Sequence, residues 1–381
     1  MVEPVGFGTL AGPPLPDPRA AMNTFPRPKL RVEHLEDRCV PAAFLGKSTA
    51  GLLPSEVTGV AIGGEPVVVV GSQTGGVARV FIGTTAKELR PFGADFAGGV
   101  SVAAADVNGD GVTDIVAGAG AGSAPRVVVL DAQTGAEVRS FLAFDPSFTG
   151  GVSVATGDLN FDGYADIVVA AASGGAPHVK VFDGKTGAEV RSFYAYDRSF
   201  TGGVRVAAAD VNGDFRDDIV TTPGGGGGPN VRVVSGVDGT QLRSFFAYDP
   251  SYTGGVNVAA ADIDRDGFAE IITGSAAGSS HVKVFGGKTG AEQKSYYAFA
   301  PDLPGGVSVA AGVFNNDLTA DIAVASSGDS PQVRVIDGQT GNDLTDLAAG
   351  FPGGVNVGVG AARLVSLSLP VEVPTGPVAI L

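Results

Sequence analysis

A Gly-Gly-Val triplet returns along the chain at a nearly constant interval. Its first glycine is residue 98, 150, 202, 254, 305 and 353, so successive copies are 52, 52, 52, 51 and 48 residues apart. A fixed period of this length is the signature of a repeat architecture, in which each unit buries its apolar surface against the next. The fold of the chain is therefore set by what one such unit can form.

One period, residues 150–201, contains four strand-like runs. In order they read GVSVATGDL, DIVVAAA, HVKVFDG and AEVRSFYAYD. The turn sequences SGGAP and DGKTG separate the second run from the third and the third from the fourth, and the latter is a hairpin signal. Four short antiparallel strands per unit make one blade of a β-propeller, so the sequence predicts an all-β propeller of four-stranded antiparallel blades.

Two details favour blades over a β-sandwich. The first two runs of each unit are apolar at nearly every residue, as expected for strands near an axis that neighbouring blades cover on both faces. The third and fourth runs alternate instead, and basic residues recur at one position of each: Lys180, Arg232, Lys283 and Arg334 in the third, and Arg139, Arg191, Arg243 and Lys294 in the fourth. We expect these outer strands to meet water at the rim.

The repeat also predicts the division of the chain. We expect a leader over residues 1–45, a propeller over 46–370 and a tail over 371–381. The expected units are 50–97, 98–149, 150–201, 202–253, 254–304 and 305–352, with a closing strand at 353–368. An open ring would expose strand edges, so we expect the closing strand to pair with the first unit and complete six blades. Seven blades are the alternative, if residues 42–56 and the tail together form another.

Charge and the N-terminus bear on the cellular setting. The net charge of −15 argues against nucleic acid as a partner, because binding phosphates needs clustered Lys and Arg. There is no membrane-spanning apolar run, and the one cysteine, Cys39, permits no internal disulfide. The segment LRVEHLEDRCVP resembles an N-terminal motif of large surface proteins of planctomycete-type bacteria. That resemblance implies an extracellular or cell-surface protein exported by an unclear route, with Met1 or Met22 as its start.

An acidic loop recurs where the first strand-like run of a unit meets the second. Counted from its first Asp, oxygen-bearing side chains fill positions 1, 3, 5 and 9. The four full copies are Asp106, Asn108, Asp110 and Asp114; Asp158, Asn160, Asp162 and Asp166; Asp210, Asn212, Asp214 and Asp218; and Asp262, Asp264, Asp266 and Glu270. Alternating oxygens in a tight loop point to one centre, and a hard cation that takes six to eight oxygens is the natural occupant. We therefore predict about four structural Ca²⁺ sites.

Other interpretations of the loop need weighing. An EF-hand requires Glu at position 12 and flanking helices, but position 12 is Ala117 and the flanks are strand-like. Asp and Asn also form turns without any metal, although several carboxylates in one empty loop would repel one another. In the third copy Phe215 replaces the glycine of position 6, which strains the turn. The fifth copy keeps only Asn315, Asp317 and Asp321, so we expect a weak or empty site there.

The stretch FTGGVSVATGDLNFDGYADIVVAA, residues 148–171, resembles the FG-GAP repeat, also called the VCBS-type repeat, of the N-terminal propeller of integrin α-subunits. Phe148 and Gly150 stand near the Phe-Gly of that repeat, and the acidic loop matches its calcium loop. The resemblance covers roughly residues 50 to 365. It implies a calcium-stiffened propeller used for adhesion or ligand recognition, with structural rather than catalytic metal.

Propeller topology sorts the loops into two ends. The acidic loops and the DGKTG-type turns share one end, and the glycine-rich turns and the blade-to-blade segments share the other. The second end would gather a candidate ligand face: Tyr196, Phe200, Tyr248, Tyr252, His178, Asn230 and His281. The alternative is that these aromatic residues pack between blades.

No nucleophile–base pair or zinc set can be assembled from three His and one Cys. We therefore expect a non-enzymatic module that binds a protein or a glycan. The alternative is a polysaccharide-active enzyme, a lyase or hydrolase, on a calcium-stabilised propeller. It would need a non-repeating acid/base cluster in one blade.

Overall fold

The computed structural model describes residues 58–62, 65–72, 74–82, 85–313, 319–327 and 332–347. Within these ranges the regular structure is entirely β-strand, in six four-stranded antiparallel sheets. In every sheet the strands are hydrogen-bonded in chain order, first to second to third to fourth. The prediction of an all-β propeller built from four-stranded antiparallel blades is confirmed.

The strand boundaries repeat closely from sheet to sheet. The first sheet contains β1 (Thr58–Ile62), β2 (Glu65–Gly71), β3 (Ala78–Ile82) and β4 (Thr85–Leu89). The second contains β5 (Val100–Ala105), β6 (Asp114–Ala119), β7 (Arg126–Asp131) and β8 (Glu137–Leu142). The third contains β9 (Val152–Gly157), β10 (Asp166–Ala171), β11 (His178–Phe182) and β12 (Glu189–Tyr194).

The remaining three sheets follow the same plan. The fourth contains β13 (Val204–Ala209), β14 (Asp218–Pro223), β15 (Asn230–Val234) and β16 (Gln241–Phe246). The fifth contains β17 (Val256–Ala261), β18 (Glu270–Ser275), β19 (His281–Phe285) and β20 (Glu292–Tyr297). The sixth contains β21 (Val307–Gly312), β22 (Asp321–Ser326), β23 (Val333–Ile336) and β24 (Asp343–Leu347).

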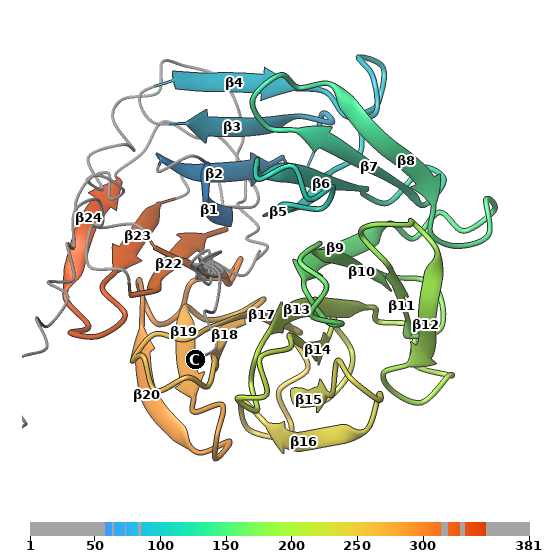
Figure 1. The fold of residues 1–381 in the computed structure, drawn as a ribbon. Helices are drawn as coiled ribbons and strands as arrows, with labels where there is room; N and C mark the ends of the chain where they lie inside the picture. The colour runs from blue at the N-terminus through green and yellow to red at the C-terminus, as the bar shows by residue number, and fades with distance from the viewer. Residues whose placement is uncertain are drawn as a thin grey trace, which may run out of the picture. The chain divides into compact units, whose positions relative to one another are not determined.

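The first strands of successive sheets are neighbours. β5 lies beside β1 and β9, β13 lies beside β9 and β17, and β21 lies beside β17 and also beside β1. Figure 1 shows these first strands on the inside and the fourth strands, such as β12, β16 and β20, on the outside. The strands differ accordingly, because β9 and β10 are buried along their whole length whereas β12 alternates between exposed and partly buried residues. This gradient is the one that the apolar and alternating runs predict.

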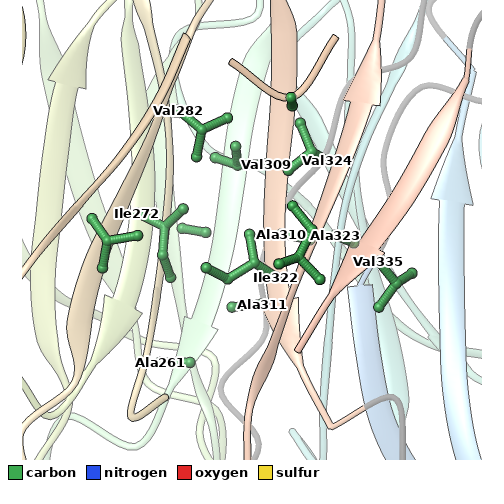
Figure 2. Packing of buried hydrophobic residues seen from close by; sticks show 14 of the residues in the cluster. Ala261, Ile272, Val282, Val309, Ala310, Ala311, Ile322, Ala323, Val324 and Val335 are labelled. Atoms are coloured by element: carbon green, nitrogen blue, oxygen red, sulfur yellow. The ribbon is translucent and has the colours of Figure 1, made fainter. Parts of the chain in front are cut away.

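The hydrophobic core lies between the sheets. One cluster combines Ile272 and Val282 of the fifth sheet with Val309, Ile322 and Val324 of the sixth, and Figure 2 shows these side chains filling the space between neighbouring strands. Corresponding clusters join the other consecutive sheets from the first to the fifth. Val, Ile and Ala dominate, and side chains of that size fill the space between two sheets that pack face to face.

The Gly-Gly-Val triplet marks the closest approach of one blade to the next. Gly203, its second glycine in the fourth sheet, has a φ of +89°, and a Cβ there would lie 1.6 Å from the carbonyl oxygen of Ala172 in the preceding sheet. Gly306 meets the backbone of Ala276 in the same way, at 2.3 Å. Only glycine satisfies both the left-handed backbone and this contact, which explains the second glycine of the triplet before the third to sixth sheets.

The basic residues of the fourth strands do more than meet water. Arg191 of β12 donates to the carbonyl oxygens of Ser235 and Gly236 in the next blade, at 2.7 and 2.9 Å. The same contact is made by Arg139 to Gly184, by Arg243 to Lys288 and by Lys294 to Gly338. Each of these side chains therefore ties its blade to the third-to-fourth-strand turn of the following one, which strand alternation alone does not predict.

Several predictions lie outside the described residues: the leader at 1–45, Cys39, the closing strand at 353–368 and the tail at 371–381. The unit boundaries stay predictions. No helix among the described residues is long and apolar enough to cross a membrane.

Candidate metal centres and ligand face

Each acidic loop connects the first strand of a sheet to the second, and all four full copies share one hydrogen-bond network. In the copy between β5 and β6, the Asp106 carboxylate accepts from the amides of Gly109 and Gly111 at 2.7 and 2.9 Å. Asn108 Oδ1 accepts from the amide of Asp110, and Asp110 Oδ1 from that of Val112. The third and fourth copies repeat these contacts. The second copy does so with one change, since Asp158 Oδ1 accepts from the amide of position 5, Asp162. The side chains of positions 1, 3 and 5 thus curl the loop inward.

The carboxylate of position 9 is buried at the start of the second strand. Asp114, Asp218 and Glu270 are at most 1% exposed, and each accepts from the amide of position 2, at 3.1 Å in all three loops. Asp166 and Asp218 also accept from the amides of Gly184 and Gly236 in the third-to-fourth-strand turn. Position 9 therefore organises the blade whether or not it also binds an ion.

Asp114 departs from this arrangement. The residue that corresponds to Gly184 is Ala132, whose amide donates to the carbonyl oxygen of Thr113 instead. Asp114 Oδ1 is consequently buried without a hydrogen-bond partner. A buried carboxylate oxygen left unpaired is costly, and a bound cation would supply the missing partner.

The pKa values of the carboxylates at position 9 also indicate a place for a cation. Burial raises the pKa of Asp114 to about 7, and the nearby carboxylates of Asp110 and Asp106 raise it further against two backbone hydrogen bonds that lower it. Burial likewise raises the pKa of Asp166, Asp218 and Glu270 to about 7. A cation in the loop would reverse these effects, because it favours the ionised form of every neighbouring carboxylate.

The fourth loop brings its carboxylates closest together. Asp262, Asp264 and Glu270 each place one oxygen so that the three atoms lie within 4.8 Å of one another. This acidic triad could hold a metal ion. In the other three loops position 3 is Asn, and Asn212 Nδ2 lies 3.0 Å from Asp214 Oδ2. Amide and carboxylate oxygens are the ligands that hard cations prefer, so the residues of all four loops fit Ca²⁺ chemically.

Positions 4 and 6 adopt left-handed backbone in all four loops. Gly109 and Gly111 have φ of 74° and 81°, whereas Phe215 at position 6 of the third loop has φ of 67° and Phe161 at position 4 of the second has φ of 62°. Phe215 is also 79% exposed. The turn in the third loop therefore does carry the strain expected from its sequence, and position 4 is a second such place that the sequence reasoning missed.

The fifth loop is described only in part. Asp321 is fully buried, and its Oδ1 accepts from the amide of Gly338 at 3.2 Å. Asn315 and Asp317 lie outside the described residues, so the weak site predicted there stays a prediction.

The aromatic residues of the candidate ligand face lie between blades. Tyr196 OH donates to the carbonyl oxygen of Asn230 at 2.7 Å, and Tyr248 OH to that of His281 at 2.9 Å, in each case in the following blade. Tyr252 OH likewise donates to the carbonyl oxygen of Ala277, and the ring of Phe200 lies over Gly202. Burial raises the pKa of Tyr196 and Tyr248. These contacts agree with the alternative in which the aromatic residues pack between blades.

The polar members of the face lie beside exposed aromatic side chains. His178, Asn230 and His281 begin the third strand of three consecutive blades, and their cross-strand partners are Tyr194, Phe246 and Tyr297 at the ends of the fourth strands. Those partners are 37%, 52% and 51% exposed. Sequence reasoning missed them, although the alternation of β12, β16 and β20 placed them on the outward side.

Comparison with known proteins places two of these loops in a family. The FG-GAP repeat model matches residues 98–136 and 150–188, which include the first and second acidic loops. No curated protein matches the chain. FG-GAP repeats commonly bind calcium, and their propellers are ligand-binding modules that are typically non-catalytic. The chain therefore contains FG-GAP repeats, and its four-stranded sheets form the blades of a β-propeller, as in the N-terminal domain of integrin α-subunits.

Proposed function

We propose that the chain is a calcium-stiffened, non-enzymatic adhesion or ligand-recognition module that acts outside the cell. The observation that carries this proposal is the environment of Asp114, a fully buried carboxylate with an unpartnered Oδ1 beside two further loop carboxylates. A cation is the simplest group that satisfies an oxygen in that setting.

Positions 1, 3, 5 and 9 of the four loops would hold the ions. An ion bound there would supply positive charge, and the loop residues would supply the oxygens that coordinate it. This coordination would fix the first strand of the blade to the second. Extracellular modules commonly bind calcium with dissociation constants of roughly 10⁻⁴ to 10⁻³ M. Such sites fill in an extracellular setting, which supports an exported protein.

We infer that six blades complete the propeller. Six described sheets and the contact between β1 and β21 support this number. A seventh blade would have to come from residues outside the described ranges.

The surroundings of His178 and His281 favour a role in recognition over a role in catalysis. His178 Nε2 lies 2.7 Å from Ser192 Oγ, and His281 Nε2 lies 2.8 Å from Ser295 Oγ. Among the described residues no carboxylate is hydrogen-bonded to either imidazole, so the third member that orients a catalytic base does not accompany them. The partner that we propose is a protein or a glycan.

The proposal is tested by incubating the calcium-loaded chain with a panel of soluble polysaccharides and immobilised extracellular proteins. Capture should be measured together with the chain length of each polysaccharide. We expect retention of at least one partner and unchanged polysaccharide length, with retention lost in chelator. Shortened polysaccharide chains would instead support the enzyme.

A further inference from the structure

A ladder of packed rings runs to the rim of the blade formed by β17–β20. The ring centroids of Tyr252 and Tyr248 are 5.4 Å apart, those of Tyr248 and His281 are also 5.4 Å apart, and His281 stacks on Tyr297 at 4.7 Å and 29°. Tyr248 and Tyr252 are anchored between blades by their hydroxyl groups. Tyr297, the last ring, is therefore held in one orientation although about half of it is exposed.

The blade formed by β9–β12 repeats this ladder. Phe148 and Phe144 are 5.8 Å apart, Phe144 and His178 are 5.4 Å apart, and His178 stacks on Tyr194 at 4.6 Å and 18°. The two ladders are separated by one intervening blade. The same exposed ring is thus presented twice, each time at the end of a fourth strand.

Hydrogen-bonding and paired charged groups accompany each exposed ring. In the β17–β20 blade His281 Nε2 contacts Ser295 Oγ at 2.8 Å, and Lys283 pairs with Glu292 at 2.7 Å. Burial lowers the pKa of His281, so the imidazole is neutral at neutral pH. The β9–β12 blade has the same set in His178, Ser192, Lys180 and Glu189. The His281 cluster therefore offers hydrogen-bond donors and acceptors without a net charge, whereas Arg198 adds a cation beside Tyr194 in the other cluster.

We propose that these two His–Ser–Tyr clusters are binding subsites for a neutral polysaccharide. The C–H face of a sugar ring carries partial positive charge and packs on the electron-rich face of tyrosine, while the hydroxyl groups at its edge match the mixed donors and acceptors beside it. The net charge of −15 disfavours polyanions. The core of a protein interface is depleted of charged residues, whereas a Lys–Glu pair accompanies each of these rings. The inference rests on the proposed recognition function and names its site and ligand class.

The intervening blade lacks such a cluster, and one arginine makes the two subsites differ from each other. Between them, Asn230 bonds Ser244 at 3.1 Å beside Phe246, so the imidazole and the tyrosine hydroxyl are both absent from that cluster. In the β9–β12 blade Arg198 Cζ lies 4.3 Å from the centroid of Tyr194. The corresponding residue after Tyr297 is Pro301. The Tyr297 subsite is therefore the more open of the two.

Two subsites on one rigid array give a polymer an advantage over a short sugar. Once a chain is bound at one subsite, its binding at the second is effectively intramolecular. Loss of one tyrosine should then weaken a long polysaccharide more than a disaccharide.

The test uses the calcium-loaded full chain and an array of immobilised neutral oligosaccharides and polysaccharides. The double variant Tyr194→Ala/Tyr297→Ala is compared with Phe215→Ala, which removes an exposed ring at the opposite end of the propeller. Tyr194→Phe/Tyr297→Phe keeps both rings and isolates the role of the hydroxyl groups. The single variant Tyr297→Ala, which should weaken a long polysaccharide more than a disaccharide, covers the case in which the double alanine variant fails to fold. The melting temperature of every variant is recorded.

We expect the wild type to retain at least one neutral glycan, the double alanine variant to bind it at least about tenfold more weakly, and the phenylalanine and Phe215→Ala variants to bind within about threefold of wild type. No retained neutral glycan, or equal binding by the double alanine variant, overturns the inference. If the chain instead retains a protein or an acidic glycan, and the double alanine variant retains it equally well, the inference about the two subsites is overturned. The proposed recognition function would still stand.

Discussion

The amide nitrogen of Ala165 lies 2.9 Å from the carbonyl oxygen of Asp106 and joins two neighbouring acidic loops. The same bond links Asp217 to Asp158 and Ala269 to Asp210. In each case position 8 of one loop donates to position 1 of the preceding loop. Hydrogen bonds therefore connect the four loops from blade to blade. An ion that orders one loop should also stabilise the next loop.

Removing calcium should lower the melting temperature. A ligand that binds only the folded state stabilises it by mass action, and calcium at ten times its dissociation constant contributes about 1.4 kcal/mol per site. For a domain of this size that corresponds to about 2 °C or more per site. Differential scanning calorimetry in excess chelator and in millimolar calcium measures the effect, with magnesium as the control ion. Identical curves in chelator and calcium would contradict it.

The metal-free protein should be less stable at pH 7.5 than at pH 5. Burial raises the pKa of Asp114 and Asp166 to about 7 in the folded chain, whereas an unfolded Asp titrates near 3.9. Between these values the folded state binds more protons than the unfolded state, so stability falls as pH rises from about 4 to 7. Calcium binds the ionised form and should abolish or reverse this trend. Urea midpoints at both pH values, measured in metal-free buffer and then in calcium, test the sign; a metal-free midpoint that rises with pH would oppose the prediction.

Two glycines of the first loop should tolerate alanine very differently. Both have positive φ, but a Cβ on Gly109 would lie 2.2 Å from the ring of Tyr164 in the next loop, whereas a Cβ on Gly111 meets nothing within 4 Å. Gly111→Ala should cost about 1 kcal/mol for its backbone alone. Gly109→Ala should cost about 2 kcal/mol or more because the ring must also move. Equal losses in chemical denaturation would show that the contact between loops does not matter.

The sequence repeat made the fold predictable, whereas features that differ between blades or depend on contacts between blades could not be predicted. Five of the six sheets follow a Gly-Gly-Val triplet, and in four of these triplets the second glycine meets the backbone of the preceding blade, as Gly203 does. The oxygen pattern likewise identified the loops. The sequence could not show that Asp114 has an unpartnered oxygen or that Arg191 reaches the next blade. Both depend on how two blades or two turns meet, which is non-local information.

The rim arginines should stabilise the contacts between blades. Arg191 donates to three carbonyl oxygens of the next blade, those of Ser235, Gly236 and Val237. Arg191→Ala should destabilise the protein by about 1 to 3 kcal/mol, because charged hydrogen bonds are lost and carbonyls are left unpaired. Arg198→Ala on the same blade is the matched control and should cost about 0.5 kcal/mol or less. Urea denaturation decides between them, and indistinguishable midpoints would refute the role of Arg191.

A calcium titration of the metal-free chain by isothermal calorimetry tests the central claim most directly. The four full loops predict about four bound ions per chain. The variant Asp262→Asn/Asp264→Asn, which removes two carboxylates of the fourth loop's acidic triad, should bind one fewer. We expect that loss with the remaining sites preserved. No calcium binding up to about 10 mM, well above the range for extracellular sites, or an unchanged count in the variant would contradict the account.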